Sequence, residues 1–442
     1  MTGGEDAPWK EIHMPGGADH AMLTKRGLEC LSQRDIELWG DYADAVYMKY
    51  SSYPDGYYSD PVSISPYLCF VDDIPFHYIP HEPVEYNNWR VETVDGRTRL
   101  IALPLPENIH YRHCAVAFPF YFSNIAAALA AGRQDDAARF AGCLCHVLED
   151  SASLLHGLEG VDGTDIFVLD RFVPPPAENP YLAPSMALTS PLIDPGPQGY
   201  EPKLLGINPQ EAAFHLYTRF CDTVLANRVH VLPVLQAVYA GDEELKAYHM
   251  EEVATGIIRL LADVLHTAAV MASGSFDAAE TEQLKRVSLR DVRAIRRPRH
   301  LSSPYRFTPF IKDACLNTER QPVPLALRFD DGSRLEYESG LGMGAHAEFF
   351  FEYILPEGVF SRLTGALGLH PELGGQGHVA FSWELDERVI WRDEYHGLHT
   401  ASTFDLDVSD GSRLVLRGRA MTDDALSRDN NIVLAVPVLR KA

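Results

Sequence analysis

The spacing of apolar residues divides the chain into two parts. Between residues 23 and 274, apolar residues recur mostly at intervals of three and four, which places them on one buried face of a helix. From about residue 322 the interval becomes two, as in strands whose alternate side chains are buried. The pattern therefore predicts an all-α domain followed by a β domain. Helices are predicted over residues 28–49, 115–131, 135–158, 210–226 and 243–272.

Short strands and turn residues in the last part predict a β-sandwich of the jelly-roll kind. Residues 326–329 and 334–338 alternate on either side of Asp-Asp-Gly-Ser, a sequence typical of a hairpin turn. About eight short segments separated by Gly, Asp and Pro are typical of a sandwich. Further strands are predicted over residues 347–353, 362–369, 378–385, 388–391, 401–408, 413–419 and 432–438.

Irregular and basic stretches complete the outline. Prolines interrupt residues 55–77, so this stretch is predicted to be a loop, and residues 172–208 form a second, longer one. Residues 286–299 hold a basic cluster, which could make peripheral contact with an anionic membrane or be a solvated linker. The predicted domains are residues 1–285 and 322–442, with a linker over 286–321.

Composition and charge restrict the partners. Of 442 residues, 46% are hydrophobic and 23% charged, as in ordinary globular proteins. The net charge of −24 argues against duplex nucleic acid, because binding to its phosphates needs clustered Lys and Arg. A small phosphate ester held by metal ions is not excluded, since the ions supply positive charge locally. No apolar run reaches the roughly 20 residues of a transmembrane helix, so no transmembrane segment is predicted.

The cysteines and the amino terminus bear on the compartment. The seven cysteines are odd in number and form no C-x2-C pair, which argues against a disulfide framework and a zinc ribbon. Free thiols and the absence of a signal peptide predict a cytoplasmic protein. A secreted protein with a trimmed amino terminus is the alternative.

The clearest candidate chemistry lies in His146-Val-Leu-Glu-Asp150-Ser-Ala-Ser-Leu-Leu-His156. His146 and Asp150 are four residues apart, so on a helix their side chains leave from one face, one turn from each other. An imidazole nitrogen and a carboxylate oxygen at this spacing suit zinc. His156 follows nearly three turns later and could serve a neighbouring ion. A single histidine is more often a core or surface residue, so the interpretation depends on the rest of the chain.

Further candidate ligands lie upstream in a fixed order. His20 lies in a His-Ala-Met context, Asp55 in Tyr-Pro-Asp, and His77 between two aromatic residues. With Trp9 near the start, the series resembles the zinc-dependent phospholipase C family, whose wider relatives include the P1-type single-strand nucleases. The resemblance covers roughly residues 9–275 and implies an α-helical fold.

The resemblance also implies a centre of two or three zinc ions. Asp150 would bridge two of them, and His156 with His215 would hold a third. The implied metal ligands are His20, Asp55, His77, His146, Asp150, His156 and His215, with Glu211 and Trp9 as further candidates.

Two departures from the family pattern put this ligand set in question. Arg219 stands where the family has a distal glutamate, four residues after His215, and arginine cannot bind a metal. Glu211, one turn before His215, could replace it. The family also uses a free amino group at its Trp, whereas eight residues precede Trp9 here, which makes His13 an alternative ligand.

The activity that the resemblance implies is hydrolysis of a phospholipid or small phosphodiester by a water that bridges metal ions. Asp55 would be catalytic, because it could orient or deprotonate that water. A P1-type nuclease would share the metal set and need aromatic platforms such as Tyr57, Tyr58 and Phe76. A non-catalytic metal-binding protein and a carbohydrate-binding protein with a helical scaffold are further alternatives.

The last part resembles the NPCBM group of galactose-binding-like modules, which are put forward as carbohydrate-binding. Glycine and hydrophobic repeats at residues 341–344, 363–369 and 374–381 carry the resemblance, which covers about residues 335–442. It implies that this domain binds a glycan, and a lipid-binding C2-like sandwich is the alternative. The aromatic residues Trp383, Trp391 and Tyr395 could contact either ligand, but core packing is the role expected for at least Trp383.

Overall fold

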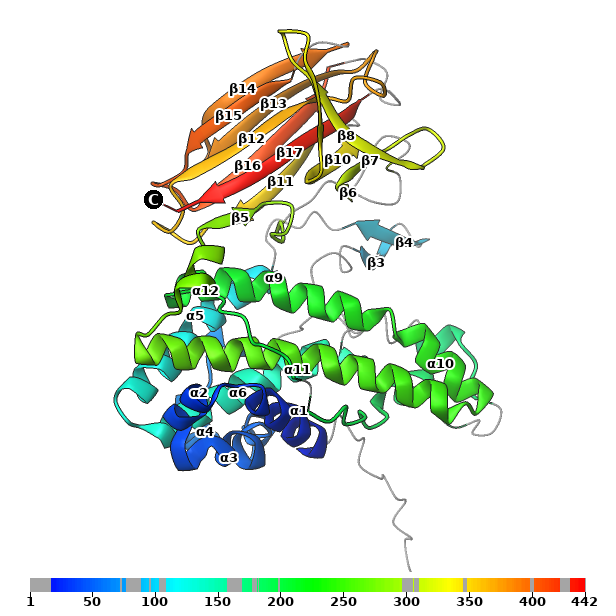
Figure 1. Ribbon diagram of the computed structural model, residues 1–442. Helices are drawn as coiled ribbons and strands as arrows, with labels where there is room; N and C mark the ends of the chain where they lie inside the picture. The colour runs from blue at the N-terminus through cyan, green and yellow to red at the C-terminus, as the bar shows by residue number, and fades with distance from the viewer. Residues whose placement is uncertain are drawn as a thin grey trace, which may run out of the picture. The chain divides into compact units, whose positions relative to one another are not determined.

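Helices and strands are segregated along the chain in the computed structural model (Figure 1). It consists of two units, Met1–Phe276, which is helical, and Asp277–Ala442, which is a β-sandwich. The predicted fold class is therefore confirmed. The structure describes residues 17–71, 74–76, 89–94, 97–102, 109–156, 169–176, 181, 183–197, 199–295, 305, 310–344, 348–397, 401–421 and 430–441.

The helical unit contains long helices and several short helical turns. The long elements are α1 (Gly17–Glu29), α2 (Gln33–Trp39), α5 (Ile109–Ala130), α6 (Gln134–Ala152), α9 (Pro209–Arg228), α10 (Val231–Ala240) and α11 (Glu243–Ser273). Short helical turns are η1 (Gly40–Tyr42), α3 (Ala43–Ala45), η2 (Val46–Tyr50), η3 (Pro54–Gly56), α4 (Pro61–Ile64), η4 (Ser65–Tyr67) and η6 (Pro184–Thr189). The antiparallel pairs are β1 (Phe70–Val71) with β2 (Ile74–Pro75), and β3 (Trp89–Val94) with β4 (Arg97–Ala102).

Helix α11 is the central helix of this unit. It packs against α1, α2, α5, α6, α9 and α10, and most of its apolar residues are buried. Asp242 caps its start by accepting a hydrogen bond from the Leu245 amide, and Gly274 ends it in the left-handed conformation. By length and composition α5 and α11 could each cross a membrane, but burial of most of α11 within the unit is typical of a core helix.

The helices differ from the predicted ones in two places. Residues 28–49 are not one helix, because α1 ends at Glu29 and a capping serine then starts α2, followed by tight turns. The helix predicted over residues 135–158 ends at Ala152, since Ser153 leaves helical geometry. The helices predicted over residues 115–131, 210–226 and 243–272 are confirmed as α5, α9 and α11.

The described residues between η6 and α9 have no regular structure, as predicted, and are tied to the helices. The Arg26 guanidinium on α1 donates to both carboxylate oxygens of Asp194, at 2.8 and 2.7 Å. The Leu205 amide donates to the Thr267 hydroxyl on α11 at 3.0 Å. These bonds hold the segment against the helical unit.

The β unit contains two main antiparallel sheets. Its elements are α12 (Ala278–Gln283), β5 (Arg286–Ser288), β6 (Ile311–Lys312), β7 (Ala314–Leu316), β8 (Pro322–Arg328), β9 (Arg334–Tyr337), β10 (Gly340–Gly344), β11 (Glu348–Ile354), β12 (Arg362–Leu369), β13 (His378–Leu385), β14 (Arg388–His396), β15 (Ser402–Asp407), β16 (Arg413–Ala420) and β17 (Asn431–Arg440). One sheet has the order β15-β12-β17-β10-β6, with β5 also pairing with β17, and the other has the order β11-β16-β13-β14. The strands β7, β8 and β9 form a smaller sheet.

Alternating burial produces the core of the sandwich. Along β13 every second residue is buried, and Trp383 lies opposite Leu416 of β16, both fully buried. Burial of Trp383 confirms the core-packing role predicted for it. Tyr395 is buried as well, so the prediction that its side chain could contact a ligand is wrong. Trp391 is half-buried. The strands predicted from the alternating pattern are confirmed as β8, β9 and β11 to β17.

Residues 286–321, predicted as a linker, contain β5, β6 and β7. The basic side chains at the start of this range belong to the folded unit. Val287 pairs with Leu439, and Arg290 is 3.0 Å from the Asp313 carboxylate. The strands were missed because each has only two or three residues, too short to show an alternation.

A glycine brings α6 unusually close to the η2 turn. A Cβ at Gly142 would lie within 2.5 Å of the Cβ and carbonyl oxygen of Tyr50. Gly142 precedes His146 by about one helical turn, so the same face of α6 meets the chain around Ser51.

We predict that Gly142→Ala destabilises the protein by about 1–3 kcal/mol, because an added methyl group would overlap the Tyr50 backbone. In an unobstructed helix the same change would favour folding by up to about 1 kcal/mol. Urea unfolding followed by circular dichroism measures the difference. An unchanged or raised free energy of unfolding would show that α6 and η2 do not meet at this residue.

Candidate metal centre

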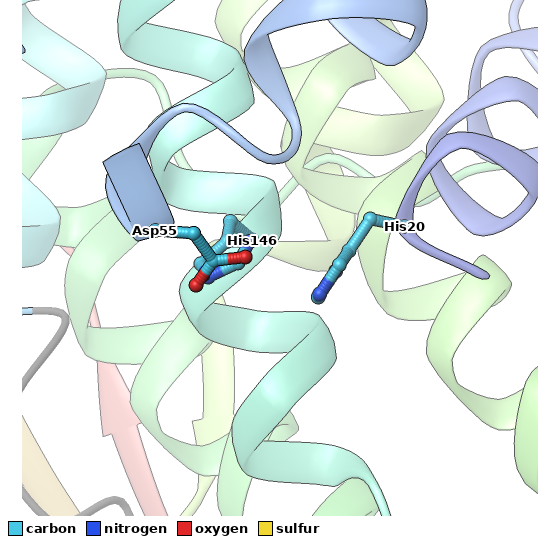
Figure 2. A group of neighbouring side chains, drawn as sticks. All are labelled: His20, Asp55 and His146. Atoms are coloured by element: carbon cyan, nitrogen blue, oxygen red, sulfur yellow. The ribbon is translucent and has the colours of Figure 1, made fainter. Parts of the chain in front are cut away.

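Side chains from three separate segments converge in the helical unit (Figure 2). His20 comes from α1, Asp55 from η3 and His146 from α6, and their ligand atoms lie within 4.8 Å of one another. Both imidazoles are buried, whereas the Asp55 side chain is 49% exposed, so the group reaches solvent on its aspartate side. Within the described part of the chain it is the one such group that could hold a metal ion.

Asp150 lies between the two imidazoles. Its Oδ2 is 3.1 Å from Nε2 of His146, and its Oδ1 is 3.4 Å from Nε2 of His20. The Oδ1 atom of Asp55 is 3.3 Å from the same His146 nitrogen. The ring centroids of the two histidines are 4.2 Å apart. The structure thus gathers four of the proposed ligands, and the one-turn spacing of His146 and Asp150 on α6 accounts for the first contact.

Each of the two imidazole rings is held in place through its Nδ1 atom. Nδ1 of His20 is 2.7 Å from the Glu149 carboxylate, which also accepts a hydrogen bond from the Thr24 hydroxyl. Nδ1 of His146 is 2.6 Å from the carbonyl oxygen of Ser51. Each ring therefore turns its Nε2 atom towards Asp150. These supporting residues were not predicted from the sequence, although the acid next to Asp150 in the helix was a signal for Glu149.

Charges at the centre are mutually stabilised. Burial would lower the pKa of His146, but Asp150 and then Asp55 outweigh burial and raise it well above its usual value. Burial would likewise raise the pKa of Asp150, but His146, His20 and His156 outweigh it and hold that pKa well below its usual value.

His156 lies beyond the end of α6 and not three turns along it, which corrects the predicted helix. The Asn227 side chain donates to the carbonyl oxygen of Ala152 at 2.8 Å, and the Ser153 amide donates to that of Asp150 at 2.9 Å. These bonds satisfy carbonyl groups that a longer helix would use itself. His156 is buried and still close enough to lower the pKa of Asp150.

Glu211 and His215 both lie on α9. Glu211 is fully buried in the first turn, where its Oε2 accepts a hydrogen bond of 3.2 Å from the Ile207 amide. His215 follows one turn later and is half-buried. Neither residue belongs to the four-residue group described above, so their role as ligands stays a prediction. Trp9, His13 and His77 lie outside the described residues.

Arg219 has a structural partner. Its Nε atom is 3.1 Å from the carboxylate of Asp263, a fully buried residue of α11. Asp263 also accepts hydrogen bonds from the Tyr200 hydroxyl at 3.0 Å and the Lys203 amide at 2.8 Å. The arginine at the position of the family's distal glutamate thus compensates a buried charge and joins α9 to α11.

One family model matches the chain. Residues 316–432 match the NPCBM/NEW2 domain, so the β unit carries this domain and the predicted resemblance of the last part is confirmed. No significant match was found among curated proteins.

Solved structures align with the chain at low identity. The alpha-toxin of Clostridium perfringens avian strain SWCP aligns over 94% of this chain and 85% of its own, at 11% identity and a TM-score of 0.30. The CBM51 module of Clostridium perfringens GH95, solved with methyl-galactose, aligns over 35% of this chain and 99% of its own, at 16% identity and a TM-score of 0.30. The CBM51-2 and INT domains of Clostridium perfringens ZmpB align over 36% of this chain at 16% identity and a TM-score of 0.30, and the chain spans 32% of that protein. We infer neither an activity nor a ligand from these alignments.

Replacing Arg219 with Met should lower the free energy of unfolding by about 1–3 kcal/mol, less than for a fully buried pair because its side chain is 35% exposed. Burial already raises the pKa of Asp263, and loss of the arginine raises it further. A raised carboxyl pKa makes the folded state bind more protons, so the deficit should grow as pH rises above the usual carboxyl range.

Denaturant unfolding at about pH 5 and about pH 8 measures the effect of Arg219→Met. Arg259→Met is a matched control, because Arg259 lies over the Tyr200 ring at 5.6 Å, a contact worth about 1 kcal/mol or less at an exposed site. Adding Asp263→Asn to Arg219→Met should recover part of the loss. A loss for Arg219→Met that is independent of pH would contradict the pairing.

Proposed function

We propose that the helical unit is a zinc-dependent phosphodiester hydrolase of the phospholipase C type. The observation that carries the proposal is the convergence of His20, Asp55, His146 and Asp150, with the Nε2 atoms of both rings directed at carboxylate oxygens. These residues occur along the chain in the order that the phospholipase C resemblance requires.

The donor set suits zinc. Imidazole nitrogen and carboxylate oxygen are common zinc ligands, and metal-binding histidines usually donate their second ring N–H to a carboxylate or a backbone carbonyl. The second ring nitrogen of His20 lies beside the Glu149 carboxylate, and that of His146 lies beside the Ser51 carbonyl oxygen. Asp150, placed between the two imidazoles, would be a further carboxylate ligand of the centre. A third ion would need His156 with residues of α9, and the predicted total stays two or three.

A bound zinc ion would supply positive charge to the phosphate oxygens and make water more acidic. Asp55 is the candidate to orient the attacking water and accept its proton, because it is the solvent-exposed member of the group. Asp150 is buried between the two imidazoles and would keep their positions fixed. A net charge of −24 repels a phosphodiester from most of the surface, so binding would depend on this local positive charge.

A P1-type nuclease is the second candidate for the same centre. Tyr57 and Tyr58 follow Asp55 after one glycine, their ring centroids are 5.3 Å apart, and the Tyr58 side chain is 76% exposed. Exposed rings beside a metal centre can stack on the bases of single-stranded nucleic acid. The strongly acidic composition favours a phospholipid or small phosphodiester over a polyanion.

We propose further that the β unit binds a carbohydrate. The match of residues 316–432 to the NPCBM/NEW2 domain supports this proposal. Trp391 is the half-buried aromatic side chain that could stack on a sugar ring. Lipid binding by a C2-like sandwich is the alternative function.

We expect the protein, purified without chelator, to contain two or three zinc ions per chain by elemental analysis. Asp150→Asn should lose zinc, because it removes the charge between the two imidazoles, and should lower kcat/KM by about a hundredfold or more. The substrates are phosphatidylcholine vesicles, bis(p-nitrophenyl) phosphate and single-stranded DNA.

His266→Gln is the control, because His266 also pairs with a buried carboxylate, at 2.9 Å, but lies outside the metal group. It should keep the zinc and the activity. A wild-type protein that binds no zinc even when it is supplied would refute the hydrolase. Cleavage of DNA in preference to both other substrates would establish the nuclease, and bound zinc without any cleavage would establish a non-catalytic metal site.

Calorimetric titration of the intact protein with a panel of simple sugars tests the β unit. We expect saturable binding of at least one sugar, equal in the wild type and in Asp150→Asn, since the sandwich forms a unit of its own. Binding of phospholipid vesicles but of no sugar would favour the C2-like alternative.

A further inference from the structure

Glu149 is a buried acid that neighbours the candidate ligands without being one of them. It precedes Asp150 on α6, and it is 1% exposed. Its Oε2 lies 2.7 Å from Nδ1 of His20, and its Oε1 accepts a hydrogen bond of 2.5 Å from the Thr24 hydroxyl. Both partners are on α1, about one turn apart, so one carboxylate is bonded to two successive turns of that helix.

Packing alone does not explain an acid at this position. Burial raises the pKa of Glu149, and the bonds from His20 and Thr24 only partly offset the cost of burial. An apolar side chain of similar size would join α6 to α1 without this cost. We therefore expect the Glu149 carboxylate to act on the groups that it contacts.

The partner on which it acts is the imidazole of His20. A neutral imidazole has one N–H and one nitrogen with a free lone pair, and a carboxylate beside one nitrogen selects the tautomer that carries its proton there. With the proton on Nδ1, the lone pair lies on Nε2, the atom that is 3.4 Å from Asp150.

We propose that Glu149 is a positioning residue, which holds His20 as its Nδ1–H tautomer and directs Nε2 into the metal centre. Thr24 fixes the carboxylate for this task. The inference rests on the proposed function where it names zinc as the ligand. The tautomer itself is a property of the metal-free protein.

The chain offers a matched control. The Oδ2 atom of Asp35 lies 2.9 Å from Nδ1 of His266, Asp35 is buried, and the pair joins α2 to α11. Neither residue belongs to the metal group. Glu149→Gln and Asp35→Asn therefore make the same chemical change in a carboxylate–imidazole pair between two helices.

Zinc affinity is measured by competition with a chromophoric chelator, and thermal unfolding of each metal-free variant is recorded beside it. Glu149→Gln should lower zinc affinity by about 10- to 100-fold, the usual effect of losing a residue that orients a metal ligand. Thr24→Val should have a smaller effect in the same direction, and Asp35→Asn should leave the affinity near that of the wild type. Equal losses in Glu149→Gln and Asp35→Asn, or none in Glu149→Gln, would overturn the proposal.

The tautomer is read in the metal-free protein by long-range proton–nitrogen NMR of ¹⁵N-histidine, under conditions in which the ring is neutral. The His20 signals are assigned by their loss in His20→Gln. We expect a protonated Nδ1 in the wild type and a mixture of tautomers in Glu149→Gln. A protonated Nε2 in the wild type would overturn the proposal. If the wild type binds no zinc, the proposed function fails, and this NMR result alone decides the role of Glu149.

Discussion

Two consecutive buried carboxylates on one helix impose the arrangement of the helical unit around its centre. Glu149 and Asp150 are both nearly inaccessible to solvent, and a buried charge is tolerated only when other groups compensate it. The two side chains leave α6 in different directions, so each needs its own partners. Glu149 finds them on α1, and Asp150 finds them in imidazoles of α1 and α6. Because His20 compensates the charge of Glu149, its ring is also placed next to Asp150.

The third segment reaches the centre through backbone packing. Because Gly142 lacks a side chain, the Tyr50 backbone can lie directly on α6, and the next carbonyl, that of Ser51, then reaches Nδ1 of His146. Asp55 follows four residues after Ser51, in the short turn η3, and contacts Nε2 of the same ring. A close backbone contact at a glycine thus places both a support and a ligand of the centre.

How much the sequence predicts depends on whether the signal is local. His146 and Asp150 could be paired from their spacing, because a helix fixes which residues share a face. Their partners His20 and Asp55 entered only through the family resemblance, since spacing carries no information about contacts between distant segments. The end of α6 at Ala152 was missed because the side chain that binds its carbonyl, Asn227, belongs to another helix. The long strands were predicted correctly because the alternation of buried and exposed residues along a strand is also a local signal.

The unit compensates its buried carboxylates in two different ways. Asp263 has a permanent cation, Arg219, together with hydrogen bonds from Tyr200 and Lys203. That arrangement cannot exchange a proton for anything else, because a guanidinium does not lose its proton in proteins. Asp150 is paired with imidazoles, which become lone-pair donors when they release a proton. Asp35 is also paired with an imidazole, that of His266, so the pairing alone does not mark a metal site. The meeting of four ligand-type side chains at Asp150 is what argues for a metal-binding centre.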